Sequence, residues 1–235
     1  MIKKYEAEVK LNEKETHDVH TIRFELDDPD FSFKAGQYMV IDLLDINENV
    51  IRSRAYSIAS PPYKKNEIKF CVKRIEGGLM SNYLCDLSKG DIVRMKGPIG
   101  SMVLPDDITD DILLIGAGTG VAPYRSMIYK LLKEDRCNAQ KIWLFFGERT
   151  QEDLFYKDEF EELEKKCTNF KFVPVLSRES WEGDEGHVQD AIPKYIKNAE
   201  GKTAFVCGLQ HMVYDVSELL LNMGFPEDKI KREKY

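Results

Sequence analysis

The sequence of 235 residues has no apolar run that approaches the ~20 residues of a membrane-spanning helix. Its first residues carry no apolar segment of the kind found in secretory signals. The five cysteines are scattered and include no C-x-x-C pair, which argues against an iron–sulfur cluster, a zinc site and a disulfide framework. The net charge of −7 provides no basic excess for binding nucleic acid. These absences favour a cytoplasmic globular protein with no membrane span and no nucleic acid partner.

Histidine is scarce as well, with four residues in the chain. His17 and His20 lie in a strand-like segment, and His187 lies in a loop. No third ligand accompanies them, so the sequence predicts no metal site.

The first ~105 residues consist of short segments separated by turn residues. Apolar and polar residues alternate with a period of two, which is typical of strands with one buried face. The expected strands are Tyr5–Leu11, Val19–Leu26, Gln37–Leu44, Arg54–Ile58, Glu67–Lys73 and Asp91–Lys96. One short helix is expected from Met80 to Leu87. Strands of this length and spacing predict a small antiparallel β-barrel.

The pattern changes after Pro105. Ile112–Ile115 is a continuous apolar run that ends at glycines, which suits a strand buried on both faces. Similar strands and intervening helices are expected at Lys141–Phe146, Asp158–Lys166, Phe170–Leu176, Thr203–Cys207 and His211–Met223, with helical spacing from Tyr124 to Leu132. This alternation predicts a parallel sheet. We therefore expect two domains, an antiparallel β-barrel over residues 1–105 and an α/β parallel-sheet domain over residues 106–235.

A glycine-rich segment, Gly116–Gly120, follows the first buried strand and precedes a helix. Glycines let the backbone approach a pyrophosphate, and the free N–H groups of a helix start stabilise its charge. The segment departs from the Rossmann pattern because Val121 occupies the third glycine site. The motif alone leaves both a dinucleotide site and a tight structural turn open.

The segment Arg54–Ser57 lies in a strand of the first domain. It could be an exposed edge. Alternatively, Arg54 could pair with a phosphate, Tyr56 could stack on a planar ring and Ser57 could bond a ring nitrogen.

A second glycine turn, Gly77–Gly78, leads into the short helix, and Ser81 is expected to cap that helix. The same helix start could hold a pyrophosphate. Two anion sites on two domains would suit a flavin dinucleotide on one and a nicotinamide dinucleotide on the other.

Along nearly its whole length the chain resembles the plant-type ferredoxin–NADP reductases and their wider superfamily of flavin reductases. The shared motifs occur in family order at Arg54–Ser60, Phe70–Arg74, Gly78–Leu84, Gly97–Gly100, Gly116–Ser126, Cys207–Leu209 and Glu233–Tyr235. The resemblance implies an FAD-dependent oxidoreductase that exchanges electrons between NADP(H) and a one-electron carrier such as ferredoxin or flavodoxin, by hydride transfer at flavin N5.

The resemblance also implies roles for individual residues. Those that hold FAD would be Arg54, Tyr56, Ser57, Val72, Lys73, Gly78, Leu79, Met80 and Ser81. Those that meet the nicotinamide nucleotide would be Gly118, Thr119, Gly120, Gly208 and Leu209. The implied catalytic residues are Ser57, Cys207 and Glu233, with Cys207 near the reacting carbon of the nicotinamide and Glu233 beside it. The ring of Tyr235 is expected to stack on the flavin.

Some of these assignments have plain structural alternatives. Cys207 could be a small buried residue at a strand end, and Tyr235 could be a frayed terminus. The plant enzymes also carry a longer loop before the glycine turn, with an aromatic residue that covers the adenine, whereas Arg74–Glu76 here leads almost directly to Gly77. The pyrophosphate turn still favours FAD over FMN.

The sequence gives opposing signals on NADPH and NADH. Ser177 and Arg178 follow the third strand of the second domain, where the family binds the 2′-phosphate of NADP. Arg149 is another candidate for binding this phosphate. However, the Lys and Tyr that complete the 2′-phosphate site of the plant-type enzymes are missing, and the segment Glu179–His187 is acidic. Glu148 could bond a ribose hydroxyl, as in NAD sites. We expect NADP as the nucleotide, with NAD as the alternative.

Two other functions share the expected fold. The chain could be the NADH-dependent reductase component of an oxygenase or cytochrome system, although such components usually work with an iron–sulfur unit whose cysteine pattern is missing here. It could also be a non-turnover flavin electron-relay subunit of a larger complex. The relay family beside dihydroorotate dehydrogenase has a C-terminal cysteine cluster, whereas residues 168–235 of this chain contain only Cys207.

Overall fold

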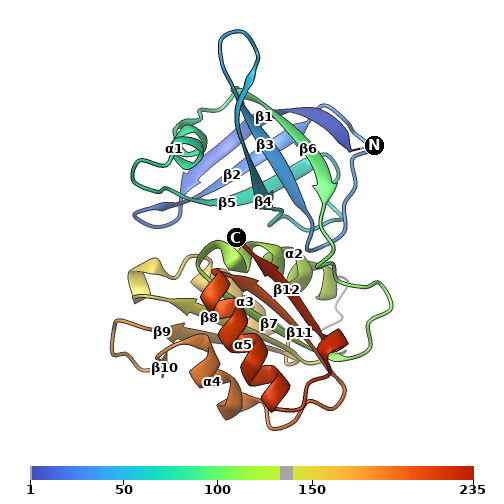
Figure 1. The fold of residues 1–235 in the computed structure, drawn as a ribbon, viewed down its shortest axis with the longest axis vertical. Coiled ribbons are helices and arrows are strands. Elements are labelled where there is room, and N and C mark those ends of the chain that lie inside the picture. The colour runs from blue at the N-terminus through green and yellow to red at the C-terminus, as the bar shows by residue number, and fades with distance from the viewer. Residues whose placement is uncertain (1, 133–139) are drawn as a thin grey trace. The chain divides into compact units, whose positions relative to one another are not determined.

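The computed structural model describes residues 2–132 and 140–235. The chain divides into two compact units, of which one comprises Met1–Leu104 with Arg125–Lys130 and the other comprises Pro105–Tyr124 with Leu131–Tyr235. Each unit is built on one six-stranded sheet. Figure 1 labels the strands of both sheets.

The sheet of the first unit is antiparallel, with the strand order β4-β3-β6-β1-β2-β5. Its strands are β1 (Lys3–Lys14), β2 (Val19–Leu26), β3 (Tyr38–Leu44), β4 (Val50–Ser57), β5 (Glu67–Lys73) and β6 (Ile92–Ile99). An antiparallel bridge joins Ile58 to Phe70, so the sheet curls until its edge strands β4 and β5 meet. This architecture confirms the antiparallel fold predicted for the first part of the chain.

The inward faces of these strands form one apolar core. Phe24, Met39 and Phe70 are fully buried in it, and the ring centroids of Phe24 and Phe70 lie 5.6 Å apart. The helix α1 (Leu79–Asp86) buries Met80 and Leu84 in the same core. Each such side chain contributes about 1.5–3 kcal/mol when fully buried, which offsets the weak intrinsic stability of a short helix.

Strand β4 begins at Val50, four residues before the predicted start at Arg54. Its first residues are mostly exposed and lack the alternation that identified the other strands. The turn before it is stabilised by Asp45, whose Oδ1 accepts the N–H groups of Asn47 and Asn49 at 2.8 Å each. Figure 1 shows this hairpin projecting beyond the rest of the sheet.

The sheet of the second unit is parallel, with the strand order β10-β9-β8-β7-β11-β12. Its strands are β7 (Asp111–Ala117), β8 (Ile142–Glu148), β9 (Phe170–Leu176), β10 (Asp184–Glu185), β11 (Lys202–Gly208) and β12 (Ile230–Lys234). The central strands are buried almost continuously because both of their faces are covered. The predicted α/β parallel sheet is therefore confirmed.

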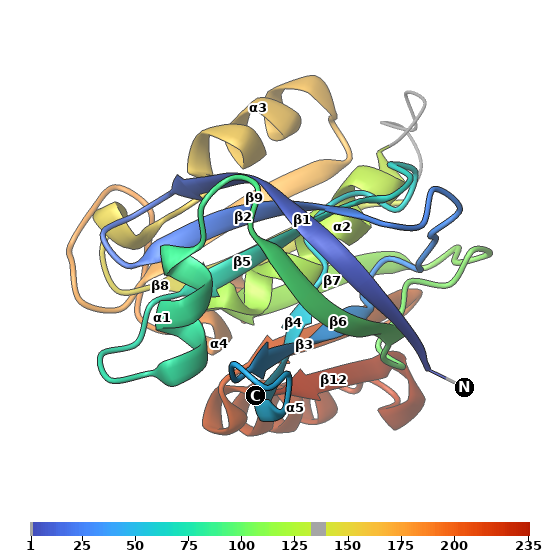
Figure 2. The same ribbon diagram turned by 90° about the horizontal axis from the view of Figure 1, so that it is seen from above.

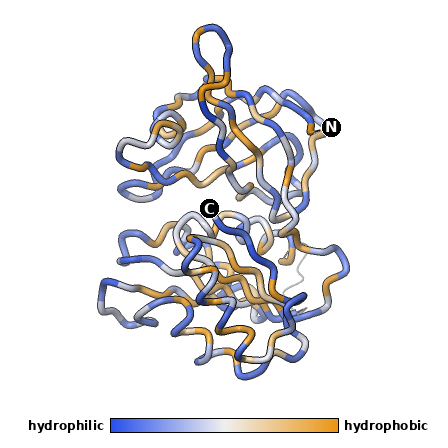
Figure 3. The backbone as a smooth tube through the Cα atoms, viewed as in Figure 1, coloured by the Kyte–Doolittle hydropathy of each residue, from blue (hydrophilic) through white to orange (hydrophobic). Residues whose placement is uncertain are grey.

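Helices cover both faces of this sheet. On one face, α4 (Val188–Tyr195) and α5 (Gln210–Asn222) pack on Leu113 and Ile115 of β7. On the other, α3 (Lys157–Lys166) places Phe160 against Phe172, with ring centroids 5.4 Å apart. Figure 2 shows α3 and α5 on opposite sides of the sheet, and Figure 3 shows the strands between them as mainly hydrophobic. A short 3-10 turn, η1 (Gly118–Val121), leads from β7 into α2 (Ala122–Leu131).

Among the strands and α-helices described in the second unit, the sequence did not predict β10, α4 and β12. The helix α4 contains Pro193, a residue that normally argues against a helix interior. Strand β12 ends the strand order of the sheet, where it pairs with β11, and most of its residues are charged. A short charged segment carries no apolar periodicity, so the sequence predicted no strand there.

In the described part of the chain, no helix is long and apolar enough to cross a membrane. The cysteines Cys71, Cys85 and Cys207 are buried and form no disulfide. Cys167 is disulfide-bonded, which the scattered cysteine pattern did not predict. Cys137 lies outside the described residues.

Candidate functional site

In the first unit, the residues expected to hold FAD come together where β4, β5 and α1 meet. Because the bridge between Ile58 and Phe70 is antiparallel, the residues that precede Ile58 in β4 run beside those that follow Phe70 in β5. Strand β5 then leads through residues 74–78 into α1. Tyr56 and Met80 pack against the same core, one from β4 and one from α1.

The side chains of β4 suit a flat anionic molecule. Arg54 is exposed and donates to the Ser53 carbonyl at 3.0 Å, and its charge has no carboxylate partner among residues 2–132 and 140–235. Tyr56 is half-buried, with its ring centroid 6.1 Å from that of Phe70, and burial raises the pKa of its phenol to about 12. Tyr56 therefore presents a neutral ring at the edge of the core. Ser57 is the next residue, on the opposite face of the strand.

The start of α1 supplies backbone donors. Gly78 is the N-cap, and Leu79, Met80 and Ser81 are the first helical residues. Their N–H groups have no acceptor within the helix, which is the arrangement that favours a phosphate. Gly77 has a φ of +68°, a left-handed backbone that favours glycine.

Ser81 is not the helix cap that the sequence predicted, because the helix begins before it. Its Oγ accepts the N–H of Ile75 at 3.1 Å and donates to the carbonyl of Gly78 at 3.3 Å. A Cβ on Gly78 would lie 2.5 Å from this Oγ. Ser81 thus shapes the turn that leads into α1.

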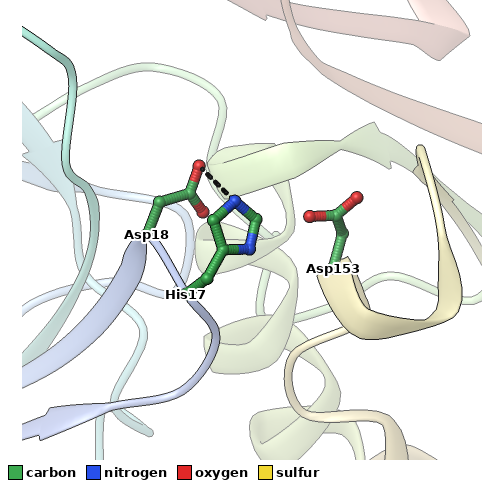
Figure 4. A group of neighbouring side chains, drawn as sticks. All are labelled: His17, Asp18 and Asp153. Carbon is green, nitrogen blue, oxygen red and sulfur yellow. Dashed lines mark ion pairs between the residues drawn. The ribbon is translucent and has the colours of Figure 1, made fainter.

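Val72 and Lys73 end β5, and the Val72 side chain is buried. The Lys73 ammonium pairs with Asp18 at 2.8 Å. Figure 4 shows Asp18 beside His17, with Nε2 of the ring 3.5 Å from Oδ2. Asp153, drawn in the same figure, belongs to the second unit, where its Oδ2 accepts the N–H and the hydroxyl of Thr150 at 3.1 and 2.9 Å. These contacts account for both carboxylates within their own units, and we assign no metal to them.

In the second unit, the glycine-rich turn is shaped by close backbone approach. A Cβ on Gly120 would lie 2.4 Å from the carbonyl oxygen of Cys207, and one on Gly116 would lie 2.9 Å from the Tyr124 ring. Gly118 has a φ of +55° with open space around it. Together with Thr119 these glycines lie at the carboxyl end of β7, the edge of parallel sheets where ligands bind.

Tyr124 supports this turn, a role that the sequence did not reveal. It is fully buried, and its hydroxyl lies 2.9 Å from the Ile115 carbonyl and 2.8 Å from that of Phe205. These carbonyls belong to the neighbouring strands β7 and β11. A tyrosine in an otherwise apolar helix face is the signal that could have found it, because a buried phenol needs a partner.

Cys207 and Glu233 are neighbours. The register of the parallel strands places Cys207 opposite Gly116 on one side and opposite Glu233 on the other. The Cys207 side chain is fully buried, and burial, with a smaller contribution from Glu233, raises the pKa of its thiol. The thiol is therefore neutral at pH 7. Gly208 ends the same strand, and the exposed Leu209 is the N-cap of α5.

Tyr235 lies beside the glycine-rich turn and is not frayed. Its hydroxyl donates to the Ala117 carbonyl at 3.2 Å and accepts from Thr119 Oγ1 at 3.4 Å. Its backbone N–H lies 3.4 Å from the Gly208 carbonyl oxygen. The ring is thus held among residues expected to bind the nicotinamide nucleotide.

The candidate residues for the 2′-phosphate meet where β8 and β9 end. The Arg178 N–H donates to the Arg149 carbonyl at 2.9 Å. The N–H and the hydroxyl of Ser177 donate to the Glu148 carbonyl at 3.0 and 3.2 Å. Within the described ranges, neither arginine has a carboxylate partner.

The acidic segment after Arg178 is largely engaged by donors of its own unit. Glu179 accepts the N–H of Gln151 at 2.7 Å and its side-chain amide at 2.8 Å, and these bonds lower the pKa of Glu179. Asp184 pairs with Lys194 at 2.6 Å. Lys194 therefore offsets the charge of Asp184, whereas Glu179 remains a charged carboxylate.

Comparison with known proteins gives the family. Residues 6–104 match the family described as "Oxidoreductase FAD-binding domain", and residues 114–218 match "Oxidoreductase NAD-binding domain". The chain is 35% identical over 214 residues to Ferredoxin–NADP reductase B of Sorangium cellulosum (strain So ce56), covering 87% of this chain and 86% of that protein. The chain belongs to the superfamily of ferredoxin–NADP reductases and related flavin reductases, as its motifs predicted.

Other relatives are reductase components. The chain is 33% identical over 220 residues to the phenol 2-monooxygenase reductase component DmpP of Pseudomonas sp. (strain CF600), covering 91% of this chain but only 60% of that protein. The crystal structure of the Amycolatopsis cytochrome P450 reductase GcoB superimposes with a TM-score of 0.90 at 27% identity, covering 99% of this chain and 70% of that one. The chain is thus a flavin-dependent oxidoreductase, and the same architecture forms part of longer proteins.

Proposed function

We propose that this flavoenzyme exchanges electrons between NADP(H) and a one-electron carrier protein of the ferredoxin or flavodoxin type, in the cytoplasm. In this proposal, residues 1–105 bind FAD and residues 106–235 bind the nicotinamide nucleotide. Bound FAD supplies the chemistry, since it accepts a hydride at N5 and releases electrons singly. The observation that supports the preference for NADP is the pair Arg149 and Arg178. Their backbones are hydrogen-bonded to each other after the carboxyl ends of β8 and β9, and neither has a carboxylate partner in the described chain.

The first unit has the groups that FAD requires. Arg54 would pair with phosphate, Tyr56 would stack on the ring system and Ser57 would hydrogen-bond its edge. Backbone groups at Val72 and Lys73 would line the ring. The N–H groups at the start of α1, from Gly78 to Ser81, would hold the pyrophosphate.

The second unit would orient the nucleotide. Gly118, Thr119 and Gly120 would contact its backbone phosphates and ribose, with Gly208 and Leu209 on the adjacent strand end. The 2′-phosphate would lie between Arg149 and Arg178, with Ser177 donating a hydroxyl. Orientation and exclusion of water are the protein's contribution to the rate.

Electron delivery tests this proposal directly. The FAD-loaded protein should reduce purified ferredoxin or flavodoxin at the expense of NADPH, as followed by the absorbance of the carrier. The rate should scale with the FAD content of the preparation. Failure with both carriers would contradict the proposal.

A second candidate is the reductase component of an oxygenase or cytochrome system. It is favoured by the 33% identity with the phenol 2-monooxygenase reductase component. NADH in place of NADPH, with electrons delivered only to an oxygenase-type acceptor, would identify this function.

Cys207→Ala and Glu233→Gln should each slow flavin reduction by NADPH about two- to tenfold, the effect of one hydrogen bond made in the transition state. Both kcat and kcat/KM should fall, while FAD content stays constant. Glu227→Gln serves as a control, because Glu227 lies in the turn before β12 and its carboxylate pairs with Arg232. Native rates in both variants would show that Cys207 and Glu233 are structural.

Tyr235→Ser should tighten NADP binding about two- to tenfold, because the ring occupies the place that the nicotinamide takes. The factor corresponds to the 0.5–1.5 kcal/mol of an aromatic stack. Tyr235→Phe is the matched control, since it removes the hydroxyl contacts with Ala117 and Thr119 but keeps the ring. Titration of NADP while recording flavin difference spectra gives the affinities. Identical titration curves for Tyr235→Ser and the native protein would show that the Tyr235 ring does not occupy the place of the nicotinamide.

A further inference from the structure

The helix α1 depends on contacts with other elements for its position. It has eight residues and is about 12 Å long, too short to persist by itself in water. Met80, Leu84 and Cys85 anchor one face of it by burial. Its last turn contains no basic residue, so the helix itself provides no charge to stabilise its final carbonyls.

The Leu87 N–H donates to the Leu84 carbonyl at 3.3 Å. Asn12, on strand β1, supplies a further donor. Its Nδ2 lies 3.3 Å from the Leu84 carbonyl oxygen, 3.2 Å from that of Cys85 and 2.8 Å from that of Leu87. Carbonyls at a helix end have no partner within the helix. An amide nitrogen carries two protons, so three oxygens share them. One side chain from a distant strand therefore fixes the end of α1.

His20, on strand β2, orients that side chain. Its Nδ1 lies 2.9 Å from Asn12 Oδ1. Since Nδ2 of Asn12 faces the helix carbonyls, Oδ1 must accept and the proton lies on Nδ1 of the ring. Burial, and then the charges of Arg74 and Lys14, lower the pKa of His20, so the ring is neutral at pH 7.

Arg74 attaches α1 at a second place. Its guanidinium lies 2.6 Å from Asp86 Oδ1 and 3.2 Å from Asn82 Oδ1. The last turn is thus held from two sides, and the helix start at Leu79 is exposed.

We propose that Asn12 and His20 are positioning residues for the flavin pyrophosphate. Asn12 fixes the last turn of α1, and His20 keeps the Asn12 amide turned toward that turn. A displacement of the last turn of so short a helix is transmitted to its first turn, where the N–H groups of Leu79, Met80 and Ser81 lie. This inference rests on the proposed flavin site at the start of α1.

Two variants of His20 test the role of Nδ1. His20→Asn places an amide N–H close to the position of Nδ1, whereas His20→Gln places it close to that of Nε2. The full-length apoprotein of His20→Gln should bind FAD about tenfold more weakly than the native protein, the usual effect of one lost hydrogen bond, and His20→Asn should stay within about threefold. Equal affinities for the two variants would overturn the proposal.

The variant Asn12→Ala provides an independent test of the role of Asn12 in FAD binding. It should weaken FAD binding at least as much as His20→Gln, and the double variant should be no weaker than Asn12→Ala alone, because His20 acts through Asn12. Additive losses would contradict that coupling. A fall in thermal stability with native FAD affinity would show a merely structural role and overturn the proposal.

Hydrogen exchange separates this inference from the proposed function. In the apoprotein, His20→Gln should speed exchange of the α1 amides near Leu84, and unchanged exchange would overturn the anchoring of α1. If the native protein binds no FAD while exchange still responds, the flavin site fails and the anchoring by Asn12 and His20 stands.

Discussion

Replacing Gly120 with alanine should lower the rate of flavin reduction by NADPH about a hundredfold. The new Cβ would lie 2.4 Å from the Cys207 carbonyl oxygen and 3.2 Å from the Gly208 Cα, both backbone atoms, so the turn must move. A displacement of ~1 Å in a site that orients a reactant costs about this factor. FAD content should not change, since the proposed FAD residues other than Tyr235 lie in the first unit.

Two other glycines provide controls for this prediction. Gly118→Ala meets no atom within 4 Å and bears only the strain of a φ of +55°. Gly201→Ala, with a φ of +62° and open space, lies before β11 at its amino end and should alter stability alone. Stopped-flow reduction and thermal unfolding of all three variants distinguish the effect of the steric clash at Gly120 from the effect of backbone strain at Gly118 and Gly201. A native rate of flavin reduction in the Gly120→Ala variant would show that the nucleotide does not bind at this turn.

Arg178→Ala should lower kcat/KM for NADPH by about ten- to a hundredfold and leave that for NADH nearly unchanged. The loss corresponds to one charge-assisted hydrogen bond to phosphate, ~1.5–3 kcal/mol. Arg178→Lys keeps the charge but loses the planar fork, so an intermediate value is expected. Steady-state kinetics with both nucleotides measures the effect, and equal losses with NADPH and NADH would refute the assignment.

The sequence predicted the parts of the fold that have strong local periodicity. The alternation in β2 and the continuous apolar run of β7 identified both kinds of sheet, because burial on one face or on both leaves a direct pattern. The turn after β7 was also predictable, since its glycines follow a buried strand. By contrast, β12 is short and charged, and its pairing with β11 depends on the rest of the sheet.

The candidate site was predicted as a set of residues but not as an arrangement. Arg149 and Arg178 are far apart in sequence, and their proximity follows from the parallel register of β8 and β9. Ser81 was assigned as a cap because serine favours that position, whereas the start of α1 is set by the glycine turn before it. The contacts of Asn12 with α1 join distant elements and leave no local signal.

Stopped-flow reduction of the FAD-loaded native protein, with NADPH and NADH compared side by side and no carrier present, tests the central claim most directly. The account predicts that NADPH bleaches the flavin absorbance rapidly and that NADH does so more slowly. Bleaching without a partner also excludes a non-turnover relay subunit. A flavin that neither nucleotide reduces, or that NADH reduces faster than NADPH, would contradict the account.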